Sequence, residues 1–515
     1  MRSRLVLGLA VVLAACSGGG GSSTIVLPSP PWGNFRQNNS NAGASSLINT
    51  NTGTVSLPIP IVDAEGNALT TLSTPTIDLS GNVLIATQDG IRAYAPGCFV
   101  FPPAPAPTPA GQCPLWTFTA CTPPCSNPPC ASPTPVTVGS VSASPSVTAG
   151  GTVVVGSDGD DGQPGHLFAF QEQGTSVTCL WVYPPIDRAG ASFTTKSSAA
   201  TVINSDLTLA GAFVGGDDGQ LLALNPDGSV RWSYESEGPI TSSPALDANT
   251  ILYITTQDGR LAAINFAGQQ VAQFPFPIGS PPDEPFQPSP ATNTTTTYAI
   301  GAAGTVYGIN PNGTQKWSPP VTLPLPPSGS PAFLTQSFNV GPTLTFDTIV
   351  YVVDVEGTAY GLRDVNGRVV QVQRCLPSSP TLDCMTDSCL PNDKCNTATN
   401  LCTISGVACT PDSCTTTGDT CQVSPGIKLI PETPVAITTS PAVSGDPFVV
   451  VGTTDGQVCA RNLDGTVPGQ DLTTTSGWET GNGCVQLPDA TKSSPIIGLN
   501  GVIYVTTDKA LYAIQ

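Results

Sequence analysis

The sequence is poor in charged residues, which occupy 10% of its 515 positions, against roughly 25% in a typical soluble protein. It contains one histidine, His166, so a multi-histidine metal site and a catalytic triad with a second histidine are both excluded. Acidic residues outnumber basic ones, 36 to 17, for a formal charge of -19. Nucleic-acid binding needs a basic surface, so nucleic acid is not expected as a partner.

Long apolar runs are also missing. Beyond the N-terminus, no segment is apolar and long enough to cross a bilayer as a helix. Gly and Pro, by contrast, occur 53 times each. This composition suits short strands joined by tight turns and argues against long helices.

Residues 1–15 have the layout of a lipoprotein signal peptide. Arg2 and Arg4 precede a short apolar stretch that ends in Leu13-Ala14-Ala15-Cys16. This ending resembles a lipobox, in which the thiol of Cys16 receives the diacylglycerol anchor. An ordinary signal peptide followed by a chance cysteine is the alternative interpretation.

Residues 16–30 are expected to form a flexible Gly/Ser/Pro tether between the lipidated cysteine and a folded domain. By resemblance to proteobacterial lipoproteins, Ser17 favours the outer membrane. We therefore expect a lipid anchor in the outer membrane, with the protein on the periplasmic side or at the cell surface.

Sixteen further cysteines remain, and no two are adjacent. Export would place them where disulfides persist, whereas a zinc site would need CxxC pairs and a reducing compartment. We expect disulfides, with a pairing that the sequence leaves open, among Cys98, Cys113, Cys121, Cys125, Cys130, Cys179, Cys375, Cys384, Cys389, Cys395, Cys402, Cys409, Cys414, Cys421, Cys459 and Cys484. Their clustering predicts two Cys-rich insertions, residues 98–135 and 375–425.

A pattern recurs eight times in the remaining sequence. Each copy starts with a small residue followed by Pro or, once, Ala: Thr74-Pro75, Ser144-Pro145, Ser198-Ala199, Ser243-Pro244, Ser289-Pro290, Gly341-Pro342, Ser440-Pro441 and Ser494-Pro495. A turn follows some fifteen residues later, and in seven copies it ends in Gly: Gly90, Gly162, Gly219, Gly259, Gly304, Gly357 and Gly456. In the eighth copy the turn is Asp508-Lys509.

Each copy predicts four short strands. Alternating β-formers flank Gln257-Asp258-Gly259, which is a strong hairpin signal because Gly accepts the positive φ of a tight turn. A second turn, as in Pro226-Asp227-Gly228, precedes a strand that ends in Trp232. Four-stranded sheets repeated every 40–50 residues or so are typical of propeller blades. All six Trp residues fit this repeat, so we expect each to pack into the next blade rather than to form a carbohydrate platform.

These motifs resemble the PQQ-like, quinoprotein-type propeller repeat, over roughly residues 30–515 apart from the insertions. The resemblance implies an all-β fold: an eight-bladed propeller of four-stranded antiparallel blades at residues 31–515. The last copy ends after its third strand, so Trp32–Phe35 is expected to supply the fourth strand and close the ring.

Quinoprotein dehydrogenases of this fold stack their cofactor on a disulfide between adjacent cysteines and bind Ca²⁺. This sequence lacks such a cysteine pair, so we expect no enzyme activity, no catalytic residue and no cofactor. The Asp-rich turns at residues 158–162 and 217–219 could bind Ca²⁺, but Asp and Gly are expected in blade turns anyway.

The closest functional analogy is the propeller lipoprotein of the outer-membrane barrel-assembly machinery. We therefore expect a membrane-anchored scaffold that binds envelope or surface proteins, with outer-membrane protein assembly as the process it serves. A surface-exposed recognition or adhesion protein, which the Cys-rich insertions favour, and a degenerate PQQ-dependent dehydrogenase are the alternatives.

Overall fold

The structure is a computed structural model of the 515-residue chain. It describes residues 25–26, 53–71, 73–102, 113–124, 135–159, 164–185, 191–277, 288–293, 295–340, 343–364, 372–376, 394–396, 401–403, 420–424, 427–428, 436–437, 439–443, 448–462, 483–498 and 501–515.

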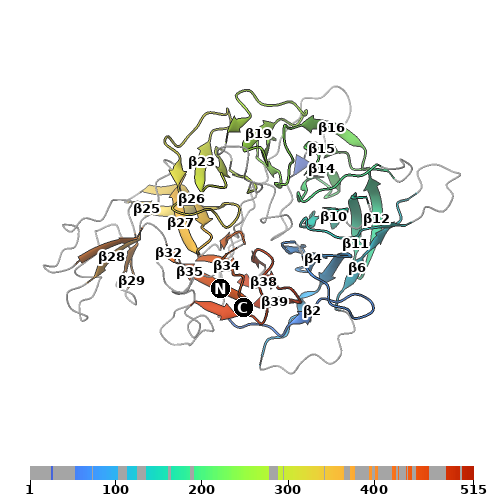
Figure 1. The fold of residues 1–515 in the computed structure, drawn as a ribbon, viewed down its shortest axis with the longest axis horizontal. Helices are drawn as coiled ribbons and strands as arrows, with labels where there is room; N and C mark the ends of the chain where they lie inside the picture. Colours follow the sequence, from blue (N-terminus) through green and yellow to red (C-terminus); the bar gives the residue numbers. More distant parts are fainter. Residues whose placement is uncertain are drawn as a thin grey trace.

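The chain forms a ring of four-stranded antiparallel sheets, the blades of a propeller (Figure 1). The first strand of each blade is near the centre, where the first strands of several successive blades contact one another. No helix among the described residues is long and apolar enough to cross a membrane.

Seven blades are each built from one segment of the chain. The first three consist of β3 (Thr76–Ile77), β4 (Val83–Thr87), β5 (Gly90–Tyr94) and β6 (Trp116–Phe118); β9 (Ser146–Val147), β10 (Thr152–Gly156), β11 (Leu167–Gln173) and β12 (Ser176–Tyr183); and β13 (Ala200–Asn204), β14 (Leu209–Gly215), β15 (Gln220–Leu224) and β16 (Val230–Glu235). The next two consist of β17 (Ala245–Leu246), β18 (Leu252–Thr256), β19 (Arg260–Ile264) and β20 (Phe276–Pro277); and β21 (Ala291–Thr292), β22 (Thr297–Ile300), β23 (Thr305–Ile309) and β24 (Val321–Thr322). The sixth and seventh consist of β25 (Ala332–Val340), β26 (Thr343–Val353), β27 (Thr358–Arg363) and β32 (Ile427–Lys428); and β33 (Ala442–Val443), β34 (Phe448–Gly452), β35 (Gln457–Asn462) and β36 (Cys484–Gln486).

One more sheet joins the two ends of the repeat region. The last repeat supplies β37 (Ile496–Ile497), β38 (Ile503–Thr506) and β39 (Ala510–Ile514), and β2 (Ile59–Pro60) adds the fourth strand. The prediction of an eight-bladed propeller is therefore corrected to seven blades plus this closing sheet. Seven blades are complete within one segment, because the last repeat has only three strands of its own.

The sequence pattern suggested Trp32–Phe35 as the closing strand, but β2 takes this position. Ile59 pairs with Leu511, and the N–H of Thr54 donates to the carbonyl of Gln515 over 2.8 Å. The edge of β39 is therefore occupied by the segment just before the first repeat. Trp32 itself lies outside the described residues.

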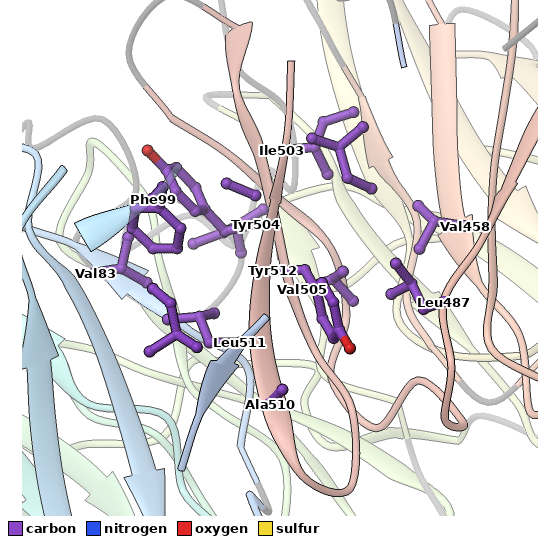
Figure 2. Close-up of a cluster of buried hydrophobic side chains, with 14 of the residues drawn as sticks. Val83, Phe99, Val458, Leu487, Ile503, Tyr504, Val505, Ala510, Leu511 and Tyr512 are labelled. Carbon is purple, nitrogen blue, oxygen red and sulfur yellow. The ribbon is translucent and has the colours of Figure 1, made fainter. Parts of the chain in front are cut away.

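The closure is also held by a buried apolar cluster. Figure 2 shows Val83 and Phe99 on one side of the β38–β39 hairpin, and Val458 and Leu487 on the other. The ring of Phe99 lies 5.0 Å from that of Tyr504, centroid to centroid. The first blade, the seventh blade and the closing sheet thus share one core. This shared core favours ring closure because it removes a large apolar surface from water.

The start of the sixth repeat was placed wrongly from the sequence. Its first strand, β25, begins at Ala332 and so follows Ser330-Pro331, whereas Gly341-Pro342 falls between β25 and β26. The first two strands of this blade have nine and eleven residues. Because these strands are longer, the Pro that lies fifteen residues before the turn at Gly357 is Pro342 and not Pro331.

Eight elements of the described residues lie outside the blade pattern. β7 (Ala120–Cys121) pairs with β8 (Val136–Thr137), and a single-turn 3-10 helix covers Pro96–Cys98. The second Cys-rich insertion contains a separate sheet of β28 (Val372–Leu376), β29 (Lys394–Asn396), β30 (Leu401–Thr403) and β31 (Thr420–Ser424). Lastly, β1 (Ile25–Val26) pairs with the first strand of the third blade.

Candidate functional site

The serines that begin seven successive repeats are joined from blade to blade by a series of hydrogen bonds. In each case the backbone N–H of one serine donates to the side-chain oxygen of the serine that begins the next blade. The bonds run from Ser144 to Ser198 (2.8 Å), Ser198 to Ser243 (3.0 Å), Ser243 to Ser289 (2.9 Å), Ser289 to Ser330 (2.9 Å), Ser330 to Ser440 (3.0 Å) and Ser440 to Ser494 (3.0 Å). These hydroxyls are bound to the backbone between blades, which is a structural role.

The tryptophans join neighbouring blades farther from the axis, as the sequence predicted. The indole N–H of Trp181 donates to the carbonyl of Pro226, that of Trp232 to Phe266 and that of Trp317 to Asp364, over 2.7–3.0 Å. Trp181 and Trp232 also lie against Gly228 and Gly268, at 2.7 Å from where a Cβ would stand. Only glycine leaves room for the indole there. Trp478 lies outside the described residues.

Antiparallel order places the turns of every blade on two opposite faces. Turns between the second and third strands share one face, and turns between the first and second and between the third and fourth share the other. We call the first the acidic face, because its turns hold the following acidic side chains in addition to buried Asp354: Asp89, Asp158, Asp217, Asp218, Asp258, Glu356, Asp455 and Asp508. We call the second the insert face, because the loop that contains Cys98 and the second Cys-rich insertion both connect a third strand to a fourth.

Several acidic side chains close their own turns. Thr87 donates to Asp89 over 2.8 Å, and Thr453 donates to Asp455 over 2.5 Å. Asp89 also pairs with buried Arg92. Burial alone would raise the pKa of Asp89, but the bonds from Arg92 and Thr87 outweigh it and hold the pKa below its usual value.

The two Asp-rich turns proposed for Ca²⁺ lie side by side in the second and third blades. Asp158 accepts hydrogen bonds from Ser140 (3.1 Å) and Ser142 (2.5 Å). Burial and then the charges of Asp158 and Asp218 raise the pKa of Asp217, against the effect of Lys196. Within the described residues no three His, Cys, Asp or Glu side chains are grouped to hold a metal. Asp160 and Asp161 lie outside them.

His166 is buried beside Phe168, with the two ring centroids 6.0 Å apart. Burial lowers its pKa, and hydrogen bonding to the carbonyls of Pro184 and Tyr183 opposes the shift. Ser157 contacts the backbone of His166, at 2.9 Å from its nitrogen. This geometry does not pair a hydroxyl nucleophile with the imidazole.

Three disulfides join cysteines among the described residues: Cys98–Cys113, Cys121–Cys179 and Cys459–Cys484. The second links the first insertion to the last strand of the second blade. In the separate insertion sheet, Cys375 lies opposite Cys421, and Cys395 opposite Cys402. Cys16, the predicted lipidation site, lies outside the described residues, as do Cys125, Cys130, Cys384, Cys389, Cys409 and Cys414.

Sequence reasoning missed Glu172, a carboxyl group at the seam between the first and second blades. Burial, followed by the charge of Asp78, raises the pKa of Glu172 to about 8, while the Trp116 side chain opposes the shift. The sequence did contain a signal for its burial. Glu172 follows Phe168 and Phe170 at intervals of two along β11, so its side chain lies on the same side of the strand as theirs.

Comparison with known proteins agrees with this architecture. The family model described as outer membrane protein assembly factor BamB matches residues 186–381. No curated protein matches the sequence. Among solved structures, BamB from Moraxella catarrhalis has 12% identity and a TM-score of 0.49, over 89% of this chain and 99% of that chain.

Two further structures are similar. The computationally designed Ika8 protein has 12% identity and a TM-score of 0.47, over 88% of this chain and 99% of that chain. A europium-containing methanol dehydrogenase has 13% identity and a TM-score of 0.40, over 92% of this chain and 89% of that chain. The resemblance to the PQQ-like β-propeller repeat is confirmed, and the family model places residues 186–381 of this chain within it.

Proposed function

We propose that this protein is a lipid-anchored, non-catalytic scaffold that binds proteins in the cell envelope and acts in outer-membrane protein assembly. The observation that carries the proposal is the match of residues 186–381 to a family described as an outer membrane protein assembly factor. The anchor is the diacylglycerol on Cys16.

The chemistry of the described residues supports a binding role. The ring serines, the indoles and several of the turn carboxylates are bound to neighbouring blades or to their own turns. Their roles are therefore structural. A rigid ring that presents turns on two faces is a common platform for protein recognition.

We infer that the acidic face is the partner-binding surface. Among its side chains, Asp218, Glu356 and Asp455 are exposed. A face with this charge favours a partner with a basic surface, and electrostatic complementarity of this kind raises the association rate at low salt. Binding should therefore weaken as the salt concentration rises.

The test is complementation in cells that lack the gene. We expect less folded outer-membrane β-barrel protein, measured by heat-modifiable migration on gels, with recovery by the wild-type chain. Asp218→Asn combined with Glu356→Gln should recover less. The matched control is Asp206→Asn with Asp227→Asn, which removes two exposed carboxylates from the insert face and should recover fully. Unchanged β-barrel levels in the deletion strain would contradict the assembly role.

Two other functions have distinct tests. A surface recognition protein, favoured by the separate insertion sheet, would be cleaved by protease added to intact cells. A degenerate quinoprotein enzyme would retain quinone absorbance after incubation with PQQ and Ca²⁺ and removal of free cofactor.

A further inference from the structure

The N-terminal segment pairs with the inner edge of the third blade. Ile25 lies opposite Asn204 and Val26 opposite Ile203, in antiparallel register. The sheet thereby has five strands in the order β1-β13-β14-β15-β16. In Figure 1, β1 is the short blue strand on the inner side of β14 and β15.

The register gives β1 a direction. β13 runs towards the insert face, because Asn204 directly precedes its turn into β14. The antiparallel partner begins at Ile25, opposite Asn204, and continues away from that turn. Ile25, the first residue of β1, therefore lies at the insert-face end of this strand.

The distance to the anchor is short. Cys16 and Ile25 are nine residues apart in the sequence, and a fully extended chain advances at most ~3.6 Å per residue, so the anchor can lie no more than ~32 Å from β1. The acidic face lies farther from Ile25 than the insert face does, by the depth of the ring. This geometry favours one orientation on the membrane.

Among the described residues, the insert face also exposes more large apolar side chains than the acidic face. Of the four large hydrophobic residues that are exposed among the described ones, three lie at insert-face turns: Leu79 (50%), Leu207 (43%) and Val230 (42%). The fourth, Val62, follows β2 on the acidic side. Leu207 also has a φ of 69°, a conformation that non-glycine residues seldom adopt, and this fixes the leucine at the tip of its turn.

The charges differ as well. The acidic face carries eight turn carboxylates besides Asp354, and three of them, Asp89, Asp258 and Asp508, pair with Arg92, Arg260 and Lys492. At the described insert-face turns, Asp206 and Asp227 are exposed, Asp78 and Asp247 are buried, and Asp364 pairs with Lys316. A membrane surface with anionic lipids repels the acidic face more strongly.

We propose that β1 orients the propeller so that its insert face lies against the lipid surface and its acidic face points away. The inference rests on the proposed lipid anchor at Cys16. It assigns Leu79 and Leu207 to the lipid-facing surface, and it leaves the acidic face accessible to protein partners.

The test measures orientation without depending on lipidation. The mature chain from residue 17, with a hexahistidine tag before it, is bound to phosphatidylcholine/phosphatidylglycerol vesicles that contain a nickel-chelating lipid. A fluorescent amino acid replaces either Leu207 or Asp455, and energy transfer to a rhodamine-labelled lipid headgroup is measured. We expect at least twofold greater transfer from position 207. Equal transfer, or greater transfer from position 455, would overturn the inference.

A paired variant tests the role of β1. Ile25→Pro with Val26→Pro removes both backbone N–H groups from the pairing and should abolish the difference between the two positions. The control, Ser22→Pro with Ser23→Pro, lies before β1 and should preserve it. A difference that persists in the Ile25/Val26 variant would show that β1 does not set the orientation. Failure of the natural anchor would appear separately, as untagged lipoprotein that stays soluble.

Discussion

The contact of Trp317 with the sixth blade should be a main source of stability between blades. Its side chain is 1% exposed, and its indole N–H donates to the carbonyl of Asp364 over 2.7 Å. The ring lies against Gly308, where a Cβ would stand 2.6 Å from the indole carbons. Trp317→Ala therefore removes buried apolar area and one hydrogen bond together.

The expected cost is large. Truncation of a buried Trp to Ala costs about 3–5 kcal/mol, and the lost partner of the Asp364 carbonyl adds to it if water does not replace the indole. Trp232 makes the equivalent bond to Phe266 over 3.0 Å but is only partly buried. Trp232→Ala should therefore cost less than Trp317→Ala, although the two positions are equivalent in the repeat.

Denaturant unfolding followed by far-UV circular dichroism measures both costs. Gly308→Ala supplies the specific control, because its Cβ collides with the indole only when Trp317 is present. It should destabilise the wild-type chain and have much less effect in the Trp317→Ala background, with a coupling of about 1–3 kcal/mol. A Trp317→Ala midpoint equivalent to within roughly 0.5 kcal/mol of wild type would refute the reasoning, as would equal costs of Gly308→Ala in both backgrounds.

Four further predictions follow from other contacts. Because the pKa of Glu172 is raised to about 8, the folded state prefers its protonated form, and stability falls as pH rises from the unfolded value towards and through 8; Glu172→Gln should raise the melting temperature at pH 9 more than at pH 5. Gly228→Ala should destabilise more than Gly174→Ala, because both glycines have positive φ but only Gly228 lies against Trp181; equal losses in denaturant midpoint would mean that backbone strain alone matters. Deletion of residues 376–424 should leave the far-UV spectrum of a folded propeller, since the insertion strands pair only with one another within the described residues. Cys16→Ser should abolish palmitate labelling and membrane fractionation, and continued labelling would rule out the anchor.

Much of the fold could be predicted from local patterns. Alternating β-formers around Asp-Gly turns specify hairpins, because the side-chain period and the positive φ of Gly are properties of a few adjacent residues. The repeated Trp predicted contacts between blades, and Trp181, Trp232 and Trp317 make them. Export chemistry and an even cysteine count likewise predicted disulfides, three of which join described cysteines.

Features that depend on distant segments could not be predicted in this way. The closing strand was assigned to Trp32–Phe35, but Ile59–Pro60 pairs with β39, because strand choice depends on which segment fits the open edge and its apolar core. The sixth repeat was misplaced because a longer hairpin changed the spacing between Ser330-Pro331 and the next turn.

The sequence by itself determined the repeat, the hairpins and the type of contact that joins the blades, since each depends on residues close together in the chain. Only the tertiary structure decided the pairing of the cysteines, the burial of Glu172 and the pairing of β1 with β13. Each of these brings together groups from separate segments. Their energies depend on distances and dielectric surroundings that exist only once the ring has closed.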